Sequence, residues 1–145
     1  MDRSMKIIVV AALAALGLME AQDQTTRSVW DGVYTSAQAG RGQSLYGAQC
    51  GSCHGATLEG GESAPALAGG EFLSEWNGLT AGDLFERIRT TMPQNKPGRL
   101  TREVNADILA YLLSVNQFPS GKTELSHVTE ELKGIRIDAT KPEKK

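Results

Sequence analysis

Two cysteines and a histidine stand close together in this 145-residue chain, within the sequence Cys50-Gly51-Ser52-Cys53-His54. Two thiols three residues apart share one helical turn, so each can add to one vinyl group of a porphyrin. The imidazole of His54 then lies beneath the macrocycle, where a ring nitrogen can bind the iron. The spacing therefore predicts one haem c, attached covalently through Cys50 and Cys53, with His54 as an iron ligand.

Other uses of paired cysteines fit this chain less well. A thioredoxin-like dithiol has the same cysteine spacing, but it needs no following histidine and usually lies in a βαβ setting. A structural zinc site needs four ligands, whereas the chain offers two cysteines, His54 and the distant His127. A disulfide between residues three apart closes a very short loop and adds little stability.

The iron needs a second axial ligand opposite His54. Three of the four methionines lie within the first 19 residues, which leaves Met92 as the one thioether in the rest of the chain. Pro93 and Pro97 stiffen the segment around Met92 because proline fixes φ. Methionine more commonly fills gaps in a core, but the haem motif favours His54 and Met92 as the two metal ligands. His127 is the rival ligand, and its polar surroundings are typical of a surface histidine.

Ligation by an imidazole and a thioether would determine what the iron can do. A thioether stabilises ferrous iron and raises the reduction potential. With both axial positions filled, oxygen and peroxide find no open site. This arrangement favours one-electron transfer, and we do not expect an enzyme. A haem peroxidase or a gas-binding protein is the catalytic alternative, and it would need five-coordinate iron.

The N-terminal segment predicts export. Arg3 and Lys6 precede an apolar run that extends to Met19 and has about the length of a signal-peptide core. The run is shorter than the roughly 20 apolar residues that a transmembrane helix needs. We expect residues 1–21 to be a signal peptide and the protein to be periplasmic. Met19 stands where a small residue is usual before a cleavage site, so an uncleaved membrane anchor is the alternative.

The rest of the chain has the size of one domain. Its formal net charge of −2 gives no basic excess for binding nucleic acid. Three stretches have apolar residues at helical spacing, each with a Ser or Thr at its start as an N-cap. These predicted helices span about residues 37–49 with Ser36 as N-cap, 80–91 starting at Thr80, and 102–116 with Thr101 as N-cap.

The other segments are expected to be irregular. Residues 22–35 read as an extended N-terminal arm anchored by Trp30 and Tyr34, and residues 55–79 as a glycine-rich loop wrapped around a cofactor. Residues 119–145 read as a charged C-terminal tail, partly disordered. Four apolar residues are expected to hold part of this tail on the domain: Leu125, Leu132, Ile135 and Ile137.

Several short stretches point to one family. They are residues 42–46 (GQSLY), 50–55 (CGSCHG), 64–67 (APAL), 92–100 (MPQNKPGRL) and 110–113 (AYLL). With them, the chain resembles the class I c-type cytochromes over residues 36–118. Within that class it is most similar to the bacterial single-haem domains associated with periplasmic quinoprotein dehydrogenases. The resemblance implies an all-α cytochrome c fold with three main helices around one covalently bound haem c.

The resemblance also implies roles for particular residues. The first and last helices are expected to cross near Gly42, Tyr46 and Tyr111. The Pro65 carbonyl is expected to accept a hydrogen bond from the ring nitrogen of His54 that does not bind the iron. The expected walls of the haem pocket are Leu67, Phe72, Trp76, Phe85 and Leu100.

The expected function is that of a periplasmic one-electron carrier between a dehydrogenase or respiratory donor and a downstream acceptor. The alternative is a dedicated cytochrome subunit of a quinoprotein dehydrogenase complex. The expected partners are redox proteins, such as a periplasmic dehydrogenase, a terminal oxidase or other cytochromes, with no nucleic acid. After signal cleavage we expect no stable membrane span, and a monomer or a member of a transient complex.

Overall fold

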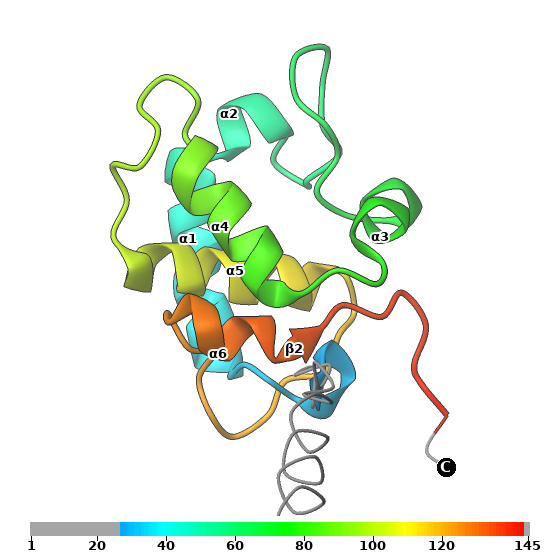
Figure 1. Ribbon diagram of the computed structural model, residues 1–145. Coiled ribbons are helices and arrows are strands. Elements are labelled where there is room, and N and C mark those ends of the chain that lie inside the picture. Colours follow the sequence, from blue (N-terminus) through cyan, green and yellow to red (C-terminus); the bar gives the residue numbers. More distant parts are fainter. Residues whose placement is uncertain (1–26, 144–145) are drawn as a thin grey trace, which may run out of the picture.

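Two helices cross at the centre of the structure, α1 (Ser36–Gln49) and α5 (Arg102–Val115) (Figure 1). The computed structural model describes residues 27–143. The helices approach closely at Gly42, where an added Cβ would lie 1.8 Å from the Asp107 carbonyl oxygen. The rings of Tyr46 and Tyr111 pack beside this contact, with centroids 5.5 Å apart. The crossing expected near these residues is confirmed.

The third main helix, α4 (Ala81–Thr91), packs against α5 and begins where the sequence predicts. The Thr80 hydroxyl accepts a hydrogen bond from the Asp83 N–H at 3.1 Å, and the Asp83 carboxylate accepts one from the Thr80 N–H at 2.9 Å. This reciprocal capping box fixes the start of the helix. At the start of α5, the predicted N-cap Thr101 is also present.

Two local predictions differ from the structure. The N-cap of α1 is Thr35, whose hydroxyl accepts a hydrogen bond from the Gln38 N–H, and Ser36 is already helical. Within the predicted glycine-rich loop lies a helix, α3 (Gly70–Trp76). It is too short to be stable by itself, and the burial of Phe72, 1 % exposed, stabilises it.

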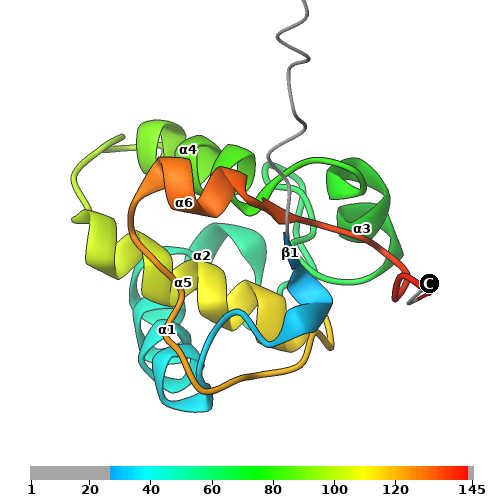
Figure 2. The same ribbon diagram turned by 60° about the horizontal axis from the view of Figure 1, so that its bottom comes forward.

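The segment after residue 118 is folded onto the domain. It forms helix α6 (Thr129–Lys133) and strand β2 (Ile135–Arg136), which pairs in parallel with β1 (Arg27–Ser28) near the start of the described chain (Figure 2). The four apolar residues expected to hold the tail are all at most 5 % exposed, which confirms that expectation: Leu125, Leu132, Ile135 and Ile137.

The N-terminal arm is anchored as expected but is not extended throughout. A 3-10 turn, η2 (Val29–Asp31), follows β1. The Trp30 indole N–H donates to the Asp138 carbonyl at 2.8 Å, and the Tyr34 hydroxyl donates to the Phe118 carbonyl at 2.6 Å. The predicted signal peptide, residues 1–21, and residues 22–26 of the arm lie outside the described residues.

The apolar core lies mainly between α1, α4, α5 and the C-terminal segment. A smaller buried cluster, made of Tyr46, Leu58 and Leu112, lies beneath the loop that follows His54. Among the helices of residues 27–143, none combines the length and the apolar character needed to cross a bilayer.

Candidate haem-attachment site

The attachment motif forms a tight turn at the end of α1. Cys50 ends α1, with its N–H bonded to the Tyr46 carbonyl at 2.8 Å, and α2 (Gly51–His54) follows at once. Both cysteines are free thiols, Cys50 half-buried and Cys53 exposed. Burial, and next the charge of Cys53, raise the pKa of the Cys50 thiol to about 11. One helical turn therefore carries two sulfurs that are in no disulfide, one half-buried and one exposed.

His54 is held in one orientation by the loop that follows it. Its side chain is buried, and its Nδ1 lies 2.8 Å from the Pro65 carbonyl oxygen. Because a carbonyl only accepts hydrogen bonds, Nδ1 carries the proton, and Nε2 is left as the nitrogen with a free lone pair. This is the contact that the family resemblance implied.

The loop reaches Pro65 by folding back on itself. The Gly60 N–H bonds to the His54 carbonyl at 2.7 Å, and the Leu67 N–H bonds to the Leu58 carbonyl at 2.9 Å. Gly60 has φ +77°, and a Cβ there would lie 2.6 Å from the Ala66 nitrogen, so only glycine fits this bend. Gly60 thus allows the tight bend that brings the Pro65 carbonyl to the His54 imidazole.

Asn116, at the end of α5, also holds this loop, and the sequence did not point to it. Its Nδ2 donates to the Leu67 carbonyl at 3.0 Å, and its Oδ1 accepts from the Gly69 N–H at 3.0 Å. The side chain is buried, at 6 % exposed. The available signal was an asparagine at the end of the predicted helix over residues 102–116.

Met92 lies directly after α4, at the start of a loop fixed at both ends. Its N–H bonds to the Ile88 carbonyl at 2.9 Å, and its side chain is half-buried. At the far end, Asn105 Nδ2 donates to the carbonyls of Leu100 and Thr101, at 3.2 and 2.8 Å. These bonds, together with the two prolines, restrict the motion of the segment that carries the thioether.

The Met92 loop lies beside the attachment turn. Arg99 donates a hydrogen bond to the side-chain carbonyl of Gln49, the residue before Cys50. Figure 1 shows the loop between α4 and α5 at the same end of the molecule as α2. The structure therefore brings the Met92 loop and the attachment motif to one end of the fold. The expected iron ligands, His54 and Met92, are 38 residues apart in the sequence.

The expected pocket walls lie on the elements around this end. Phe72 and Phe85 are fully buried, whereas Leu67, Trp76 and Leu100 are half-buried. The rings of Phe72 and Trp76 pack against each other with centroids 6.4 Å apart.

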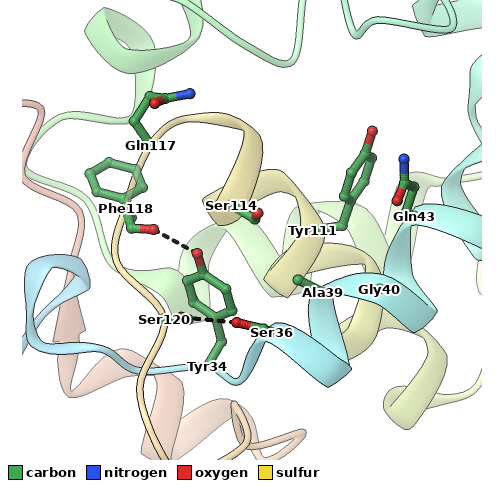
Figure 3. A pocket seen from close by; sticks show the side chains of 10 residues that line it. All are labelled: Tyr34, Ser36, Ala39, Gly40, Gln43, Tyr111, Ser114, Gln117, Phe118 and Ser120. Atoms are coloured by element: carbon green, nitrogen blue, oxygen red, sulfur yellow. Dashed lines mark hydrogen bonds between the residues drawn. The ribbon is translucent and has the colours of Figure 1, made fainter.

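The structure gives less support to His127 as an iron ligand and to a zinc site. His127 is exposed and lies 3.7 Å from a carboxylate oxygen of Glu103, so it is a surface histidine at the approach to α6. Within residues 27–143, no three His, Cys, Asp or Glu side chains are grouped to hold a metal ion, as a zinc site would need. A pocket of about 460 Å³ near Tyr34 and Tyr111 contains none of the predicted site residues (Figure 3).

The two sides of the site differ in charge. Residues 55–79 contain four glutamates and no lysine or arginine, whereas residues 87–102 contain five lysines and arginines and no acidic residue. The first segment lies beside α2 and forms α3, and the second forms the end of α4 and the Met92 loop (Figure 1). The segment after His54 is therefore acidic in sequence and the segment around Met92 is basic, although Arg89 and Arg102 are paired with Glu86.

The residues present fit a covalently bound haem c. Two free thiols share one turn, and the imidazole that follows them is held through Nδ1 with Nε2 unbonded. A disulfide or a thiol redox site would not require a histidine fixed in this way. The geometry of the donor set thus agrees with the chemistry that the spacing predicts.

Comparisons with known proteins point the same way. The chain is 32 % identical over 88 residues to the cytochrome bc1 complex cytochrome c subunit of Corynebacterium diphtheriae, covering 58 % of this chain and 30 % of that one. It is 29 % identical over 104 residues to the same subunit of Corynebacterium efficiens, covering 69 % and 33 %. The chain thus spans about a third of the length of these curated relatives.

A solved structure shares the fold. A chain of the sulfane dehydrogenase SoxCD from Paracoccus pantotrophus superposes with a TM-score of 0.51 at 23 % identity, covering 74 % of this chain and 61 % of that chain. Residues 37–112 match the family described as cytochrome c oxidase, cbb3-type, subunit III. These residues include the attachment motif, all of α4, and most of α1 and α5. The chain therefore belongs to this family of c-type cytochromes, with a cytochrome c fold and haem c attached through Cys50 and Cys53.

Proposed function

We propose that this protein is an exported one-electron carrier whose haem iron is ligated by His54 and Met92. Electron transfer is the general role of its cytochrome c family, and the proposal concerns the ligands and the location. The observation that carries it is the 2.8 Å contact between His54 Nδ1 and the Pro65 carbonyl, which leaves Nε2 for the iron. Met92 is the one thioether beyond residue 19, and its loop lies beside the attachment turn.

The residues around His54 and Met92 act mainly by keeping these two side chains in fixed positions. The Pro65 carbonyl keeps the proton on Nδ1 of His54 and so increases the basicity of the ligating nitrogen. Hydrogen bonds at both ends of the Met92 loop limit the movement of the sulfur. When bound, the haem supplies reversible one-electron chemistry at its iron. Ligands that move little between the two oxidation states suit this chemistry, and filled axial positions disfavour catalysis.

Optical spectra of the purified full-length chain test the ligation. We expect a pyridine haemochrome of haem c, a ferric sulfur-to-iron charge-transfer band, and slow carbon monoxide binding to the ferrous form. Met92→Ala should abolish the charge-transfer band and speed carbon monoxide binding. Met92→His is a matched control, because it should keep six-coordinate iron but lose the sulfur band. A Met92→Ala spectrum identical to that of the wild type would refute the thioether ligand.

Export is tested separately from ligation. Mass spectrometry of the protein from the cell envelope should find a mature chain that begins near residue 22 and carries the mass of one haem. A chain that retains its first residues would indicate the uncleaved anchor. Recovery of the chain without haem from the cytoplasm would contradict a periplasmic location.

A subunit role in a larger redox complex is the second candidate. The family description and the two Corynebacterium relatives name subunits of respiratory complexes, and the chain matches only about a third of those relatives. Purification of the tagged chain from membranes and periplasm under mild conditions distinguishes the candidates. Stoichiometric recovery of a dehydrogenase or an oxidase would favour the subunit role, and recovery of the chain alone would favour a free carrier.

A further inference from the structure

The C-terminal helix α6 packs closely against α4, the helix that leads to Met92. The contact centres on Gly82, in the first turn of α4. A Cβ at this position would lie 2.6 Å from Lys133 Cγ and 2.7 Å from the Lys133 backbone nitrogen. The backbones of the two helices are therefore in direct contact, and side-chain bulk at residue 82 would force them apart.

One turn further along α4, Glu86 is the centre of a polar network that joins three helices. Its carboxylate accepts a hydrogen bond from the Thr129 hydroxyl on α6. It also accepts from Arg89 at 2.6 Å and lies 3.7 Å from Arg102 on α5. Arg102 in turn donates to the Thr129 oxygen at 2.6 Å. The Thr129 hydroxyl thus donates to one charged group and accepts from another.

Arg102 adds two contacts that tie the same helices together. Its guanidinium lies over the ring of Phe85, 5.3 Å from the centroid, which is within range of a cation–π interaction. Its Nε donates to the His127 carbonyl at 3.2 Å, just before α6. We call the set Gly82, Glu86, Arg102, Thr129 and Lys133 the α4 clamp.

The clamp acts on the part of α4 that carries Met92. Gly82, Glu86 and Arg89 are spaced as one face of a helix, and this face is the one that α6 and Arg102 contact. Met92 caps the same helix through its N–H bond to Ile88, so any rotation or sliding of α4 moves Met92 with it. Leu84 and Phe85, on the same helix, are buried in the core.

We propose that the α4 clamp positions Met92, so that Thr129, in the C-terminal segment, sets how firmly the sulfur is held on the iron. This inference rests on the proposed ligation by Met92. Thr129 is a positioning residue here, because it acts through α4 and not by contact with the iron. The C-terminal segment then has a role in tuning the site as well as in covering the core.

The test uses the full-length holoprotein in its ferric form. Saturating imidazole replaces a dissociated sulfur, so the limiting rate of loss of the charge-transfer band measures how often Met92 leaves the iron. The variants are Thr129→Val, which removes the hydroxyl and keeps the shape, and Thr129→Ser, which restores the hydroxyl. Glu86→Gln removes the negative charge at the centre of the clamp. Unfolding by denaturant is measured on each variant as well.

The matched control is Glu124→Gln. Glu124 accepts from Arg41 at 2.9 Å and so joins the C-terminal segment to α1, away from α4. We expect Thr129→Val and Glu86→Gln to raise the limiting rate roughly tenfold, the effect of losing a hydrogen bond to a charged group. Thr129→Ser should remain near the wild-type rate, and Glu124→Gln should leave the rate unchanged.

Three results would overturn the inference, and they are distinguishable. If the wild type shows the sulfur band but Thr129→Val exchanges at the wild-type rate, the clamp does not position Met92, whatever its effect on unfolding. Equal acceleration by Glu124→Gln would likewise mean that general destabilisation opens the site. A wild type without the sulfur band would refute the ligation itself and the inference with it.

Discussion

Single side chains position the site by binding backbone atoms of loops. His54 contacts the Pro65 carbonyl, and Asn116 binds the backbone of Leu67 and Gly69 in the same loop. Residues 65–69 of this loop belong to no helix or strand that could satisfy their polar groups. A buried side chain takes that place, because buried backbone groups are costly when left without partners.

Replacing Asn116 should weaken this loop. Asn116→Ala leaves the Leu67 carbonyl and the Gly69 N–H without their side-chain partner, and we expect a loss of about 2 kcal/mol in the free energy of unfolding. Denaturant titration of the holoprotein measures it. Gln117→Ala, at the exposed neighbour, is the control and should change stability by less than about 0.5 kcal/mol. Equal effects of the two substitutions would show that the Asn116 contacts contribute nothing.

Sequence reasoning works well for residues whose chemistry depends on local spacing. Cys50, Cys53 and His54 are recognisable because haem attachment requires that spacing, and the Pro65 contact follows from the family pattern. Asn116 could not be assigned in the same way. An asparagine at a helix end is ordinarily a solvated cap, and only the folded loop shows that its partners are Leu67 and Gly69.

At the scale of elements, the crossing of α1 and α5 depends on one glycine. Gly42→Ala would place a methyl group against the Asp107 carbonyl, at 1.8 Å without rearrangement. Because this neighbour is helix backbone, the helices must separate, and we expect a loss of about 3 kcal/mol in the free energy of unfolding.

Gly47, on the same helix, provides the control. An added Cβ there meets no atom within 4 Å. Gly47→Ala should therefore stabilise the protein by about 0.5–1 kcal/mol through helix propensity alone. Thermal or denaturant unfolding compares the two variants. A similar effect of both substitutions would contradict the tight crossing.

Glu86, whose carboxylate accepts from Arg89 on α4 and Thr129 on α6, should make stability depend on acid pH. The hydrogen bond from Arg89, followed by that from Thr129, lowers the pKa of Glu86 to about 2. A group with a depressed folded-state pKa stabilises the fold above its unfolded pKa, near 4.5, and this contribution is lost as the pH falls toward 2. Glu86→Gln should therefore show a smaller loss of stability between pH 4.5 and 2 than the wild type.

Denaturant midpoints measured across this pH range check the prediction. Glu124→Gln is the comparison. It removes the exposed ion pair between Glu124 and Arg41, and exposed ion pairs contribute little to stability. Parallel pH curves for the wild type and Glu86→Gln would show that Glu86 does not couple folding to protonation.

The elements differ in how far they could be predicted. Helices α4 and α5 begin at the predicted caps because Thr80 and Thr101 act locally. Helix α3 was missed because it has glycine as its N-cap and as its first residue, and because its seven residues depend on the burial of Phe72 in the tertiary structure. The pairing of β1 with β2 joins residues more than 100 positions apart, and no local pattern specifies that register.

At the scale of the whole molecule, the C-terminal segment completes the domain. Gln38, 2 % exposed on α1, exchanges two hydrogen bonds with the backbone of Leu125, at 3.0 and 2.6 Å. Gly121 lies so close to Gly32 that a Cβ on Gly121 would be 2.0 Å from the Gly32 carbonyl oxygen. The apolar residues of the tail predicted its attachment, but these long-range backbone contacts could be found only in the folded chain.

Truncation tests how far folding depends on this segment. Removing residues 121–145 takes away four buried Leu and Ile side chains, each of which contributes roughly 1.5–3 kcal/mol. Their combined contribution of roughly 6–12 kcal/mol matches the whole stability of a typical domain. We therefore expect the chain that ends at Ser120 to lose cooperative unfolding, as measured by circular dichroism during denaturant titration.

A shorter truncation separates this effect from the loss of chain length. Removing residues 140–145 deletes a segment whose described part, residues 140–143, is exposed. The hydrogen bond from the Ala139 N–H to Asn77 at 2.8 Å is retained. The free energy of unfolding of this variant should lie within about 0.5 kcal/mol of the wild-type value. Cooperative, wild-type-like unfolding of the chain that ends at Ser120 would instead show that the domain folds without the tail and that the tail only covers it.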